Sequence, residues 1–200
     1  MTYLKIKRIL DIIFSLILLI LLSPLFIIII ILIKIDSKGP ILFKQRRIGQ
    51  FKKEFLILKF RTMRIDTPKD TPTHLLENPE KYITKLGKFL RKSSLDELPQ
   101  LFNILIGEMS FVGPRPALWN QYDLISERDR YKINDIPVGL TGWAQVNGRD
   151  ELEIIDKVKF DYYYKSKISM CLDLKCNIKT IFSVLNGNGV KEGSQNARSK

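Results

Sequence analysis

Two adjacent carboxylates are the residues best suited to chemistry in this sequence. Asp96 and Glu97 lie in the segment 93–103, where Pro99 fits a helix only if that helix starts a few residues earlier. The positive end of such a helix would keep the Asp96 carboxylate ionised and therefore nucleophilic. Neighbouring helical residues diverge by about 100°, so we expect the two carboxylates to have different roles, and one can attack while the other holds a metal. Mg²⁺ suits such a pair, because it takes one or two carboxylates and fills its other positions with water and phosphate oxygens.

The same acidic pair also has a purely structural interpretation. Ser94 and Glu97 have the spacing of a capping box, in which each side chain bonds the other residue's backbone at a helix start. Acids in a first turn also offset the helix dipole without doing any chemistry. The residues around the pair must decide between the two interpretations.

Cations are the surroundings that favour phosphate chemistry. Arg115 stands between two prolines, which hold its backbone extended and reduce the entropy lost when its guanidinium meets a phosphate. Lys59 and Arg61 are two positions apart on a predicted strand and so share a face. Arg91 closes a predicted helix shortly before the acidic pair. Together these side chains could neutralise a diphosphate, although each alone is typical of an ordinary surface charge.

Two further segments are candidates for ligand contacts. The segment 139–149 alternates glycines with Gln145, Asn147 and Arg149, which is typical of a loop around a ligand and equally of a structural turn. Asp161 precedes three tyrosines, for which packing at a membrane interface is the simpler interpretation.

Composition limits the chemistry to carboxylates and cations. The chain has 200 residues, 45% of them hydrophobic, and a formal net charge of +12, which favours one domain and an anionic partner. One histidine, His74, and two cysteines exclude a His/Cys zinc site and most histidine-dependent triads. Cys171 and Cys176 are predicted to be buried thiols in a reducing compartment.

An N-terminal apolar segment predicts a membrane anchor. Residues 12–33 carry no charge and would span about 33 Å as a helix, against about 30 Å of hydrocarbon. Pro24 crowds the carbonyl of Ile20 and predicts a break, with the Ser23 hydroxyl as a local donor. Basic residues on both sides favour a re-entrant hairpin. A spanning helix stays open as the alternative. Asp11 is expected to pair with a basic neighbour at the interface: Lys7 or Arg8.

The rest of the chain predicts a mixed domain. Residues 41–45 and 55–60 should form a β-hairpin that turns at Gly49, followed by a loop over residues 66–79. Helical spacing predicts one helix with an apolar stripe from Tyr82 to Leu90 and another from Leu174 to Leu185. We divide the chain into a membrane helix (1–38), a catalytic domain (39–190) and a flexible tail (191–200).

Several motifs in order resemble the monotopic polyprenyl-phosphate phosphoglycosyl transferases, also called bacterial sugar transferases. The similarity runs from about Leu4 to Gly193. It rests on the N-terminal basic residues with the Ser23-Pro24 break and on four further segments: Lys59 to Met63, Ser94 to Leu101, Met109 to Pro116 and Gly142 to Arg149. Pro137-Val138 departs from the Arg-Pro of many relatives, which puts in doubt any phosphate or headgroup contact at that corner.

The resemblance implies an α+β fold with a re-entrant N-terminal membrane helix hairpin. The mainly helical cytosolic domain would carry a small antiparallel hairpin and interfacial amphipathic helices. Its active site would face the cytoplasm at the bacterial inner membrane and lie against the phospholipid bilayer. We expect no nucleic-acid partner, and the oligomeric state stays open, a homodimer included.

The resemblance also implies a ping-pong reaction. Asp96 would attack the β-phosphate of a UDP-sugar, release UMP and hold the sugar phosphate until undecaprenyl phosphate takes it, with Mg²⁺ on Glu97. Such a reaction is the first membrane step of glycoconjugate or exopolysaccharide assembly. Arg115 would bind phosphate, with weaker expectations for Lys59, Arg61 and Arg91. Asp161 and Asp173 would act as structural or nucleotide-side acids.

Two other functions fit parts of the sequence. A non-catalytic, membrane-anchored basic binding protein would need only the anchor and the positive charge, and would leave the acidic pair unexplained. A polyprenyl diphosphate hydrolase would use similar cations but release inorganic phosphate instead of UMP. No motif in the sequence identifies the transferred sugar.

Overall fold

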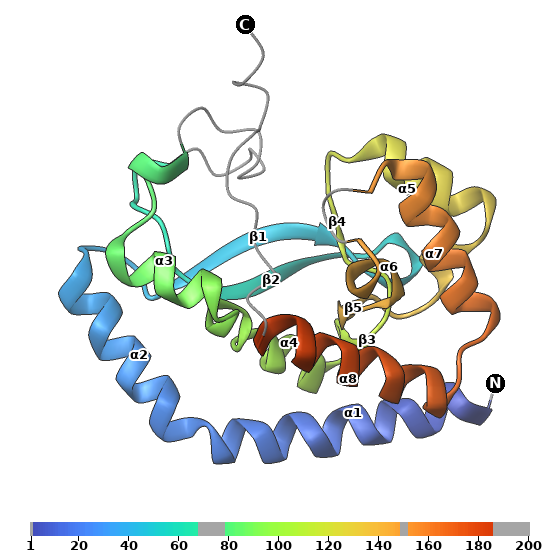
Figure 1. The fold of residues 1–200 in the computed structure, drawn as a ribbon, viewed down its shortest axis with the longest axis horizontal. Coiled ribbons are helices and arrows are strands. Elements are labelled where there is room, and N and C mark those ends of the chain that lie inside the picture. The colour runs from blue at the N-terminus through green and yellow to red at the C-terminus, as the bar shows by residue number, and fades with distance from the viewer. Residues whose placement is uncertain (1, 68–78, 149–151, 186–200) are drawn as a thin grey trace, which may run out of the picture.

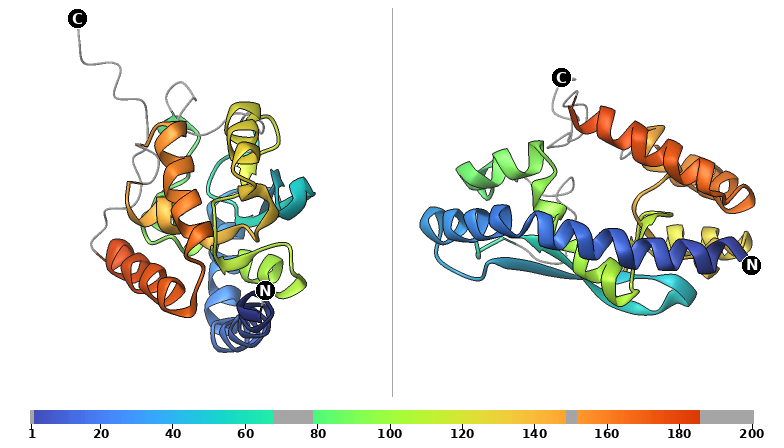
Figure 2. Two further views of the ribbon diagram at one scale, coloured as in Figure 1. Left: turned by 90° about the vertical axis from the view of Figure 1, so that its right-hand side faces the viewer. Right: turned by 90° about the horizontal axis from the view of Figure 1, so that it is seen from below.

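Two helices joined at a sharp bend open the chain and run along one side of the molecule (Figures 1 and 2). The computed structural model describes residues 2–67, 79–148 and 152–185. Its helices are α1 (Thr2–Leu21), α2 (Ser23–Asp36), α3 (Lys85–Lys92), α4 (Gln100–Ile106), α5 (Tyr122–Arg130), α6 (Trp143–Val146), α7 (Ile154–Ser166) and α8 (Met170–Leu185). Its strands are β1 (Leu42–Ile48), β2 (Glu54–Phe60), β3 (Ser110–Val112), β4 (Ala117–Leu118) and β5 (Gly139–Thr141). Short 3₁₀ turns are η1 (Gln50–Lys52), η3 (Pro79–Lys81), η4 (Leu95–Glu97) and η5 (Ile133–Asp135).

The bend between α1 and α2 falls where the sequence predicts a break. Pro24 lies at the start of α2, and the Ser23 hydroxyl donates to the Ile20 carbonyl oxygen at 2.8 Å. The two helices meet at 62°, and within the described residues neither is by itself long and apolar enough to cross a membrane, whereas the bent pair passes that test of length and composition. The proline ring and its missing donor account for the bend.

The predicted hairpin is present and longer than expected. β1 and β2 pair antiparallel from Leu42↔Phe60 to Ile48↔Glu54, and the Gly49 amide donates to the Lys53 carbonyl at the turn. β4 adds a third strand on the other edge of β1, giving the order β2-β1-β4. No periodic pattern predicted β4, because alternation cannot be recognised in a strand of two residues.

Within residues 139–148, the segment forms regular structure instead of the ligand-binding loop that its glycines suggest. β5 pairs in parallel with β3, and α6 follows it directly. Gly139 and Gly142 pack against the backbone of Gly113, where a Cβ at either position would clash. Gly139 and Gly142 are therefore needed for close backbone contact with Gly113, and not for the flexibility of a loop.

The helix predicted from Tyr82 begins later than expected. Ile83 forms an isolated bridge with Met63, and Thr84 caps α3 by accepting from the Gly87 amide at 2.9 Å. The apolar stripe therefore combines a short extended segment with a true helix. The predicted basic end of this helix is correct, since Arg91 and Lys92 occupy its last turn.

A buried ion pair ties the first helix to the last. Lys7 Nζ lies 2.6 Å from Asp173 Oδ2, and the hydroxyls of Tyr3 and Tyr164 each donate to the same carboxyl group at 2.7 Å. Figure 2, in the view from below, shows α1 between the β1–β2 ribbon and α8. This carboxylate thereby holds together α1, α7 and α8.

Three local predictions were wrong. Asp11 is buried and accepts from the Phe111 amide at 3.2 Å, so it does not pair with Lys7 or Arg8 at an interface. Arg8 instead donates to two carbonyl oxygens at the end of α4. Cys176 is buried as expected but Cys171 is exposed, since it lies on the outer face of α8. Tyr164 is buried beneath α8 and is not a tyrosine of the membrane interface.

Apolar side chains remain exposed along three helices. On α8 the exposed set is Met170, Leu174, Ile178, Ile181 and Phe182, and α1 and α2 expose many isoleucines and leucines. The predicted α8 stripe is therefore helical but points outward. The loop predicted at 66–79 and the tail at 191–200 lie largely or wholly outside the described residues.

Candidate active site

The acidic pair lies in a 3₁₀ turn, before α4 instead of inside its first turn. Asp96 and Glu97 belong to η4, and Pro99 is the residue that precedes α4. Ser94 adopts a left-handed conformation (φ 57°) and makes no side-chain capping bond, so the predicted capping box is absent. The left-handed residue redirects the chain between α3 and η4, which takes the Ser94 side chain out of capping geometry.

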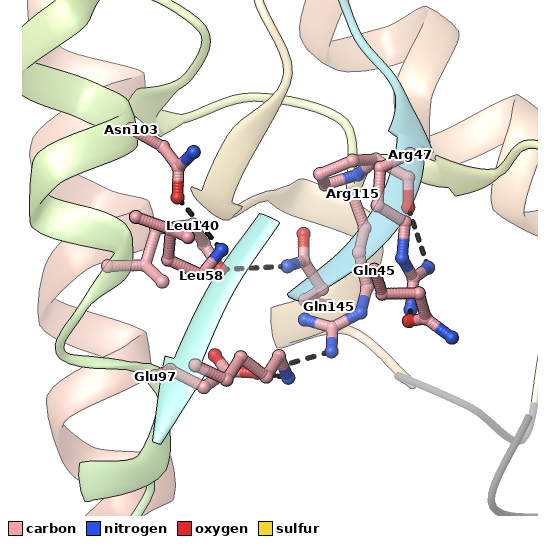
Figure 3. A network of polar contacts seen from close by, with 10 residues as sticks. Gln45, Arg47, Leu58, Glu97, Asn103, Arg115, Leu140 and Gln145 are labelled. Atoms are coloured by element: carbon pink, nitrogen blue, oxygen red, sulfur yellow. Dashed lines mark hydrogen bonds and ion pairs between the residues drawn. The ribbon is translucent and has the colours of Figure 1, made fainter. Parts of the chain in front are cut away.

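A buried amide places this turn against the hairpin. Asn103 on α4 donates to the Leu56 carbonyl at 2.9 Å and accepts from the Leu58 amide at 3.0 Å. Because β2 is an edge strand, the Asn103 side chain occupies the place of a missing neighbouring strand. Figure 3 shows this contact beside the acidic turn. It fixes α4, and with it the preceding acids, against the strand that carries Lys59.

Glu97 is held by two cations. Its Oε1 accepts from Lys59 Nζ at 2.6 Å and from Arg115 Nη2 at 3.3 Å, and Figure 3 shows Arg115 reaching toward it. Burial alone would raise the pKa of Glu97, but the charges of Lys59 and Arg115 and their hydrogen bonds lower it to about 2. Glu97 is therefore an ionised carboxylate across the physiological range.

Asp96 has the opposite electrostatic character. It is buried, and burial raises its pKa to about 6 despite the opposing charge of Lys59, with the neighbouring Glu97 carboxylate adding to the rise. Arg91 and Arg115 lower the pKa more weakly. The expectation that a helix end keeps Asp96 ionised was therefore wrong in its cause. At pH 7 the carboxylate is still mainly ionised, and it is poorly solvated, as suits a nucleophile.

Both acids line a cavity of about 1180 Å³. Lys59, Arg91 and Arg115 contribute positive charge to its wall, and Gln145 contributes an amide. Farther along, the cavity is lined by apolar side chains of α1 and α8, among them Phe14, Ile17, Leu174 and Ile181. One end is thus suited to phosphates and the other to an apolar chain.

Other predicted site residues serve different contacts. The Arg61 guanidinium lines the cavity, yet it donates to the carbonyl oxygens of Ser37 and Lys38 at 2.5–2.7 Å and so fastens the end of α2. Asn147 donates to the Trp143 carbonyl and accepts from Lys179, which ties α6 to α8. Arg149 lies outside the described residues.

The two outlying acids are both engaged in ion pairs. Asp161 is 1% exposed and accepts two bonds from Arg128, at 3.0 and 2.6 Å. Burial raises the pKa of Asp161, and the Arg128 guanidinium opposes that rise. Asp173 lines the cavity but is bound to Lys7 and two tyrosines. Within the described residues, neither Asp161 nor Asp173 makes a hydrogen bond or ion pair with the acidic pair.

The donor set suits a hard cation only together with a substrate. Within residues 2–67, 79–148 and 152–185, no group of three or more His, Cys, Asp or Glu side chains converges as a metal cage. Glu97 nevertheless offers an ionised carboxylate at the cavity wall, which fits Mg²⁺ when phosphate oxygens and water complete its coordination.

Sequence reasoning missed three residues beside the site. Gln45 and Arg47 on β1 line the cavity, and they are hydrogen-bonded to each other at 2.7 Å (Figure 3). Arg128 lines it from α5. Strand alternation could have paired Gln45 with Arg47 on one face, whereas no local signal separates Arg128 from the other charges of α5. Val138, where we expect a departure from the family pattern, is buried in the core.

Known proteins resemble this chain over most of its length. The model of the family described as bacterial sugar transferase matches residues 2–187. A UDP-glucose:undecaprenyl-phosphate glucose-1-phosphate transferase of Klebsiella pneumoniae is 40% identical over 189 residues, which cover 88% of this chain but only 39% of that protein. The chain thus spans about two fifths of that relative.

Two relatives are similar along almost their whole length. The uncharacterized sugar transferase EpsL of Bacillus subtilis is 37% identical over 93% of this chain and 90% of its own. The exopolysaccharide production protein ExoY of Sinorhizobium fredii is 37% identical over 92% of this chain and 87% of its own. These matches confirm the resemblance drawn from the motifs. The chain belongs to the bacterial sugar transferase family.

Proposed function

We propose that this chain transfers a sugar phosphate from a UDP-sugar to undecaprenyl phosphate and releases UMP. The observation that carries the proposal is a buried aspartate with a pKa raised to about 6 on the wall of a cavity lined by Lys59, Arg91 and Arg115. The printed names of relatives, which include undecaprenyl-phosphate glucose-1-phosphate and N-acetylgalactosamine phosphate transferases, support the same reaction class.

The first step forms an ester on Asp96. One carboxylate oxygen attacks the β-phosphorus, the bond from that phosphorus to the bridging oxygen breaks, and UMP leaves with the electron pair. Arg115 and Lys59 both bind Glu97, the neighbour of Asp96. They are therefore close enough to neutralise the diphosphate as charge moves to the leaving group. Because Asp96 is poorly solvated, little water has to leave its carboxylate before it attacks.

The second step regenerates the enzyme. A phosphate oxygen of undecaprenyl phosphate attacks the same phosphorus and displaces the Asp96 carboxylate, giving undecaprenyl-diphosphate-sugar. The apolar side of the cavity, between α1 and α8, suits the polyprenyl chain of this acceptor. No external base is required, because the attacking phosphate oxygen is already anionic.

We assign Mg²⁺ to Glu97. When bound there with substrate oxygens, the ion would supply charge neutralisation to the diphosphate. Lys59 and Arg115 already bind the same carboxylate, so they hold Glu97 in place and share its charge with any bound ion.

We also propose that α1 and α2 form a re-entrant hairpin at the cytoplasmic face of the bacterial inner membrane. Three features support it: the 62° bend, the exposed apolar side chains on both helices, and the basic residues near both ends of the pair. The outward apolar face of α8 would then lie in the interface beside α1.

The decisive assay is UMP release by the full chain in nanodiscs supplied with Mg²⁺ and a panel of UDP-sugars. One sugar nucleotide labelled in the sugar should leave label on the denatured protein when undecaprenyl phosphate is omitted, and peptide mapping should locate it at Asp96. Asp96→Asn should abolish both UMP release and labelling. The exposed Asp123 provides a matched control, since Asp123→Asn should retain both.

Each alternative gives a different result. Release of inorganic phosphate from undecaprenyl diphosphate, without UMP from any sugar nucleotide, would identify a hydrolase. Membrane binding with neither product would identify a non-catalytic anchored protein. UMP release without any trapped label, in rapid-quench samples as well, would reject the aspartyl ester and leave direct transfer.

A further inference from the structure

Two arginines hold the backbone on which Arg115 sits. Arg128 Nη1 on α5 donates to the carbonyl oxygen of Arg115 at 2.9 Å. Arg47 Nη1 on β1 donates to the next carbonyl, that of Pro116, at 3.0 Å. The segment between β3 and β4 is thus fixed from two sides.

Arg115 depends on this backbone support. Its side chain is 42% exposed, whereas those of Lys59 and Glu97 are 18% and 21% exposed. For a side chain this exposed, the position of its own Cα strongly affects where the guanidinium reaches. The contact from Arg115 to Glu97, at 3.3 Å, is also longer than the one from Lys59. Small displacements of the backbone would therefore move this guanidinium away from the site.

Arg128 is in turn oriented by Asp161. Its Nε and Nη2 both donate to Asp161 Oδ2, and the two side chains are only 5% and 1% exposed. The remaining nitrogen, Nη1, is thereby directed at the Arg115 carbonyl. Apolar residues often replace a buried ion pair without loss of stability, so fold stability alone does not account for a pair in this place.

We propose that Arg128, held by Asp161, is a positioning residue that fixes Arg115 for the diphosphate of the sugar nucleotide. This inference rests on the proposed function and adds two residues to it. Asp161 acts on the reaction through the Arg128 side chain and the Arg115 backbone, without touching the substrate. The proposed role explains why a buried charge pair links α5 to α7 and why its arginine also donates to the backbone of Arg115, a phosphate-binding candidate.

The test removes the pair without leaving a buried charge. The double variant Arg128→Met/Asp161→Leu replaces the charged pair with apolar side chains that keep the space filled, and it should fold. We expect its KM for the UDP-sugar to rise about tenfold, with a smaller change in kcat, because ground-state phosphate contact is lost. Introduced into an Arg115→Ala background, the same double change should alter KM by less than about twofold.

A structural role would give other numbers. Loss of folded enzyme would lower the apparent kcat, leave KM unchanged, and act equally in both backgrounds, and that pattern would overturn the proposal. Lys52→Ala serves as a matched control, because it breaks the ion pair from Lys52 to Asp129 on the same helix α5. It should leave KM as it is.

Two further measurements keep the inference separate from the proposed function. If the double variant does not fold, Arg128→Lys replaces it in the same cycle: it keeps the charge beside Asp161 but loses the planar fork. If the native chain releases no UMP, the proposed function fails, and the cycle is run on the Kd for UDP by calorimetry. Non-additive Kd values then support the positioning role, and additive values refute it.

Discussion

The Lys59 ammonium lies 2.6 Å from Glu97 Oε1, and the same cation has the largest lowering influence on the pKa of Asp96. One side chain on β2 therefore controls both acids of η4. It keeps Glu97 ionised and prevents the Asp96 pKa from rising further above about 6. The two carboxylates thus differ in acidity although they are neighbours in the chain.

Lys59→Met should move the acid limb of the activity profile toward higher pH. Without the cation, the pKa of Asp96 rises, so a larger fraction of the nucleophile is protonated at a given pH. We expect kcat/KM for UMP release at pH 7 to fall about tenfold or more, and to recover partly at pH 8.5. The exposed Lys53 gives the control: Lys53→Met should keep the native profile. An unshifted acid limb in Lys59→Met would contradict this account of Asp96.

The native pH profile should show a single acid limb near pH 6. Attack requires the Asp96 carboxylate, whose pKa is raised to about 6, so kcat/KM should fall with unit slope below that pH. Glu97, with a pKa of about 2, should not add a second limb above pH 4. Stopped-flow measurement of the UMP half-reaction isolates this step. A limb near pH 4 would show that Asp96 is solvated like an ordinary surface acid.

Asp96→Asn should stabilise the protein at neutral pH while abolishing transfer. The folded-state pKa of about 6 exceeds the ordinary aspartate value of 3.8, so the folded chain binds more protons between these values and loses stability as pH rises through this window. The asparagine variant escapes that loss. We expect a gain of about 1–3 kcal/mol at pH 7 that disappears near pH 3.5. Thermal unfolding followed by circular dichroism at both pH values measures it.

Local chemistry made part of this structure predictable. The hairpin followed from alternation around Gly49, and the bend from Pro24, because each depends on a few adjacent residues. The capping box at Ser94 failed for the opposite reason. Its spacing is correct, but a left-handed backbone conformation, set by how η4 packs between α3 and α4, removes the geometry that capping needs.

The site was predictable in composition but not in roles. Motif resemblance brought Asp96, Glu97, Lys59 and Arg115 together, and the structure places all four at one cavity. Arg61, on the same short sequence motif, was assigned to phosphate although its guanidinium fastens α2. Arg128 was missed, since its partners are 13 and 33 residues away in sequence and no periodicity links them.

Asp173→Leu should destabilise the protein strongly. It would leave the Lys7 ammonium buried without its carboxylate and remove the acceptor of two tyrosine hydroxyls. The expected loss is about 3–5 kcal/mol, measured by chemical unfolding in mild detergent. The double change Lys7→Met/Asp173→Leu should recover most of it. Asp156→Leu, at an exposed pair with Lys159, should cost under about 1 kcal/mol, and equal losses at both sites would refute the argument.

Pro24→Ala should straighten the bend and change the membrane topology. Alanine restores the backbone donor and removes the ring, so α1 and α2 can continue as one helix long enough to cross the bilayer. A cysteine introduced by Lys5→Cys, in a background with Cys171→Ser and Cys176→Ala, reports the side on which the N-terminus lies. In inside-out vesicles an impermeant maleimide should label the native topology and miss much of Pro24→Ala.

The Ser23 hydroxyl should matter less than the proline for this topology. Ser23→Ala removes a hydrogen bond to the Ile20 carbonyl, at a cost of about 1 kcal/mol, but leaves the ring that forces the bend. Its labelling should therefore stay close to that of the native chain. If the native Lys5→Cys protein reacted only in right-side-out vesicles, both helices would have to form a crossing segment, because a hairpin returns to the side from which it enters.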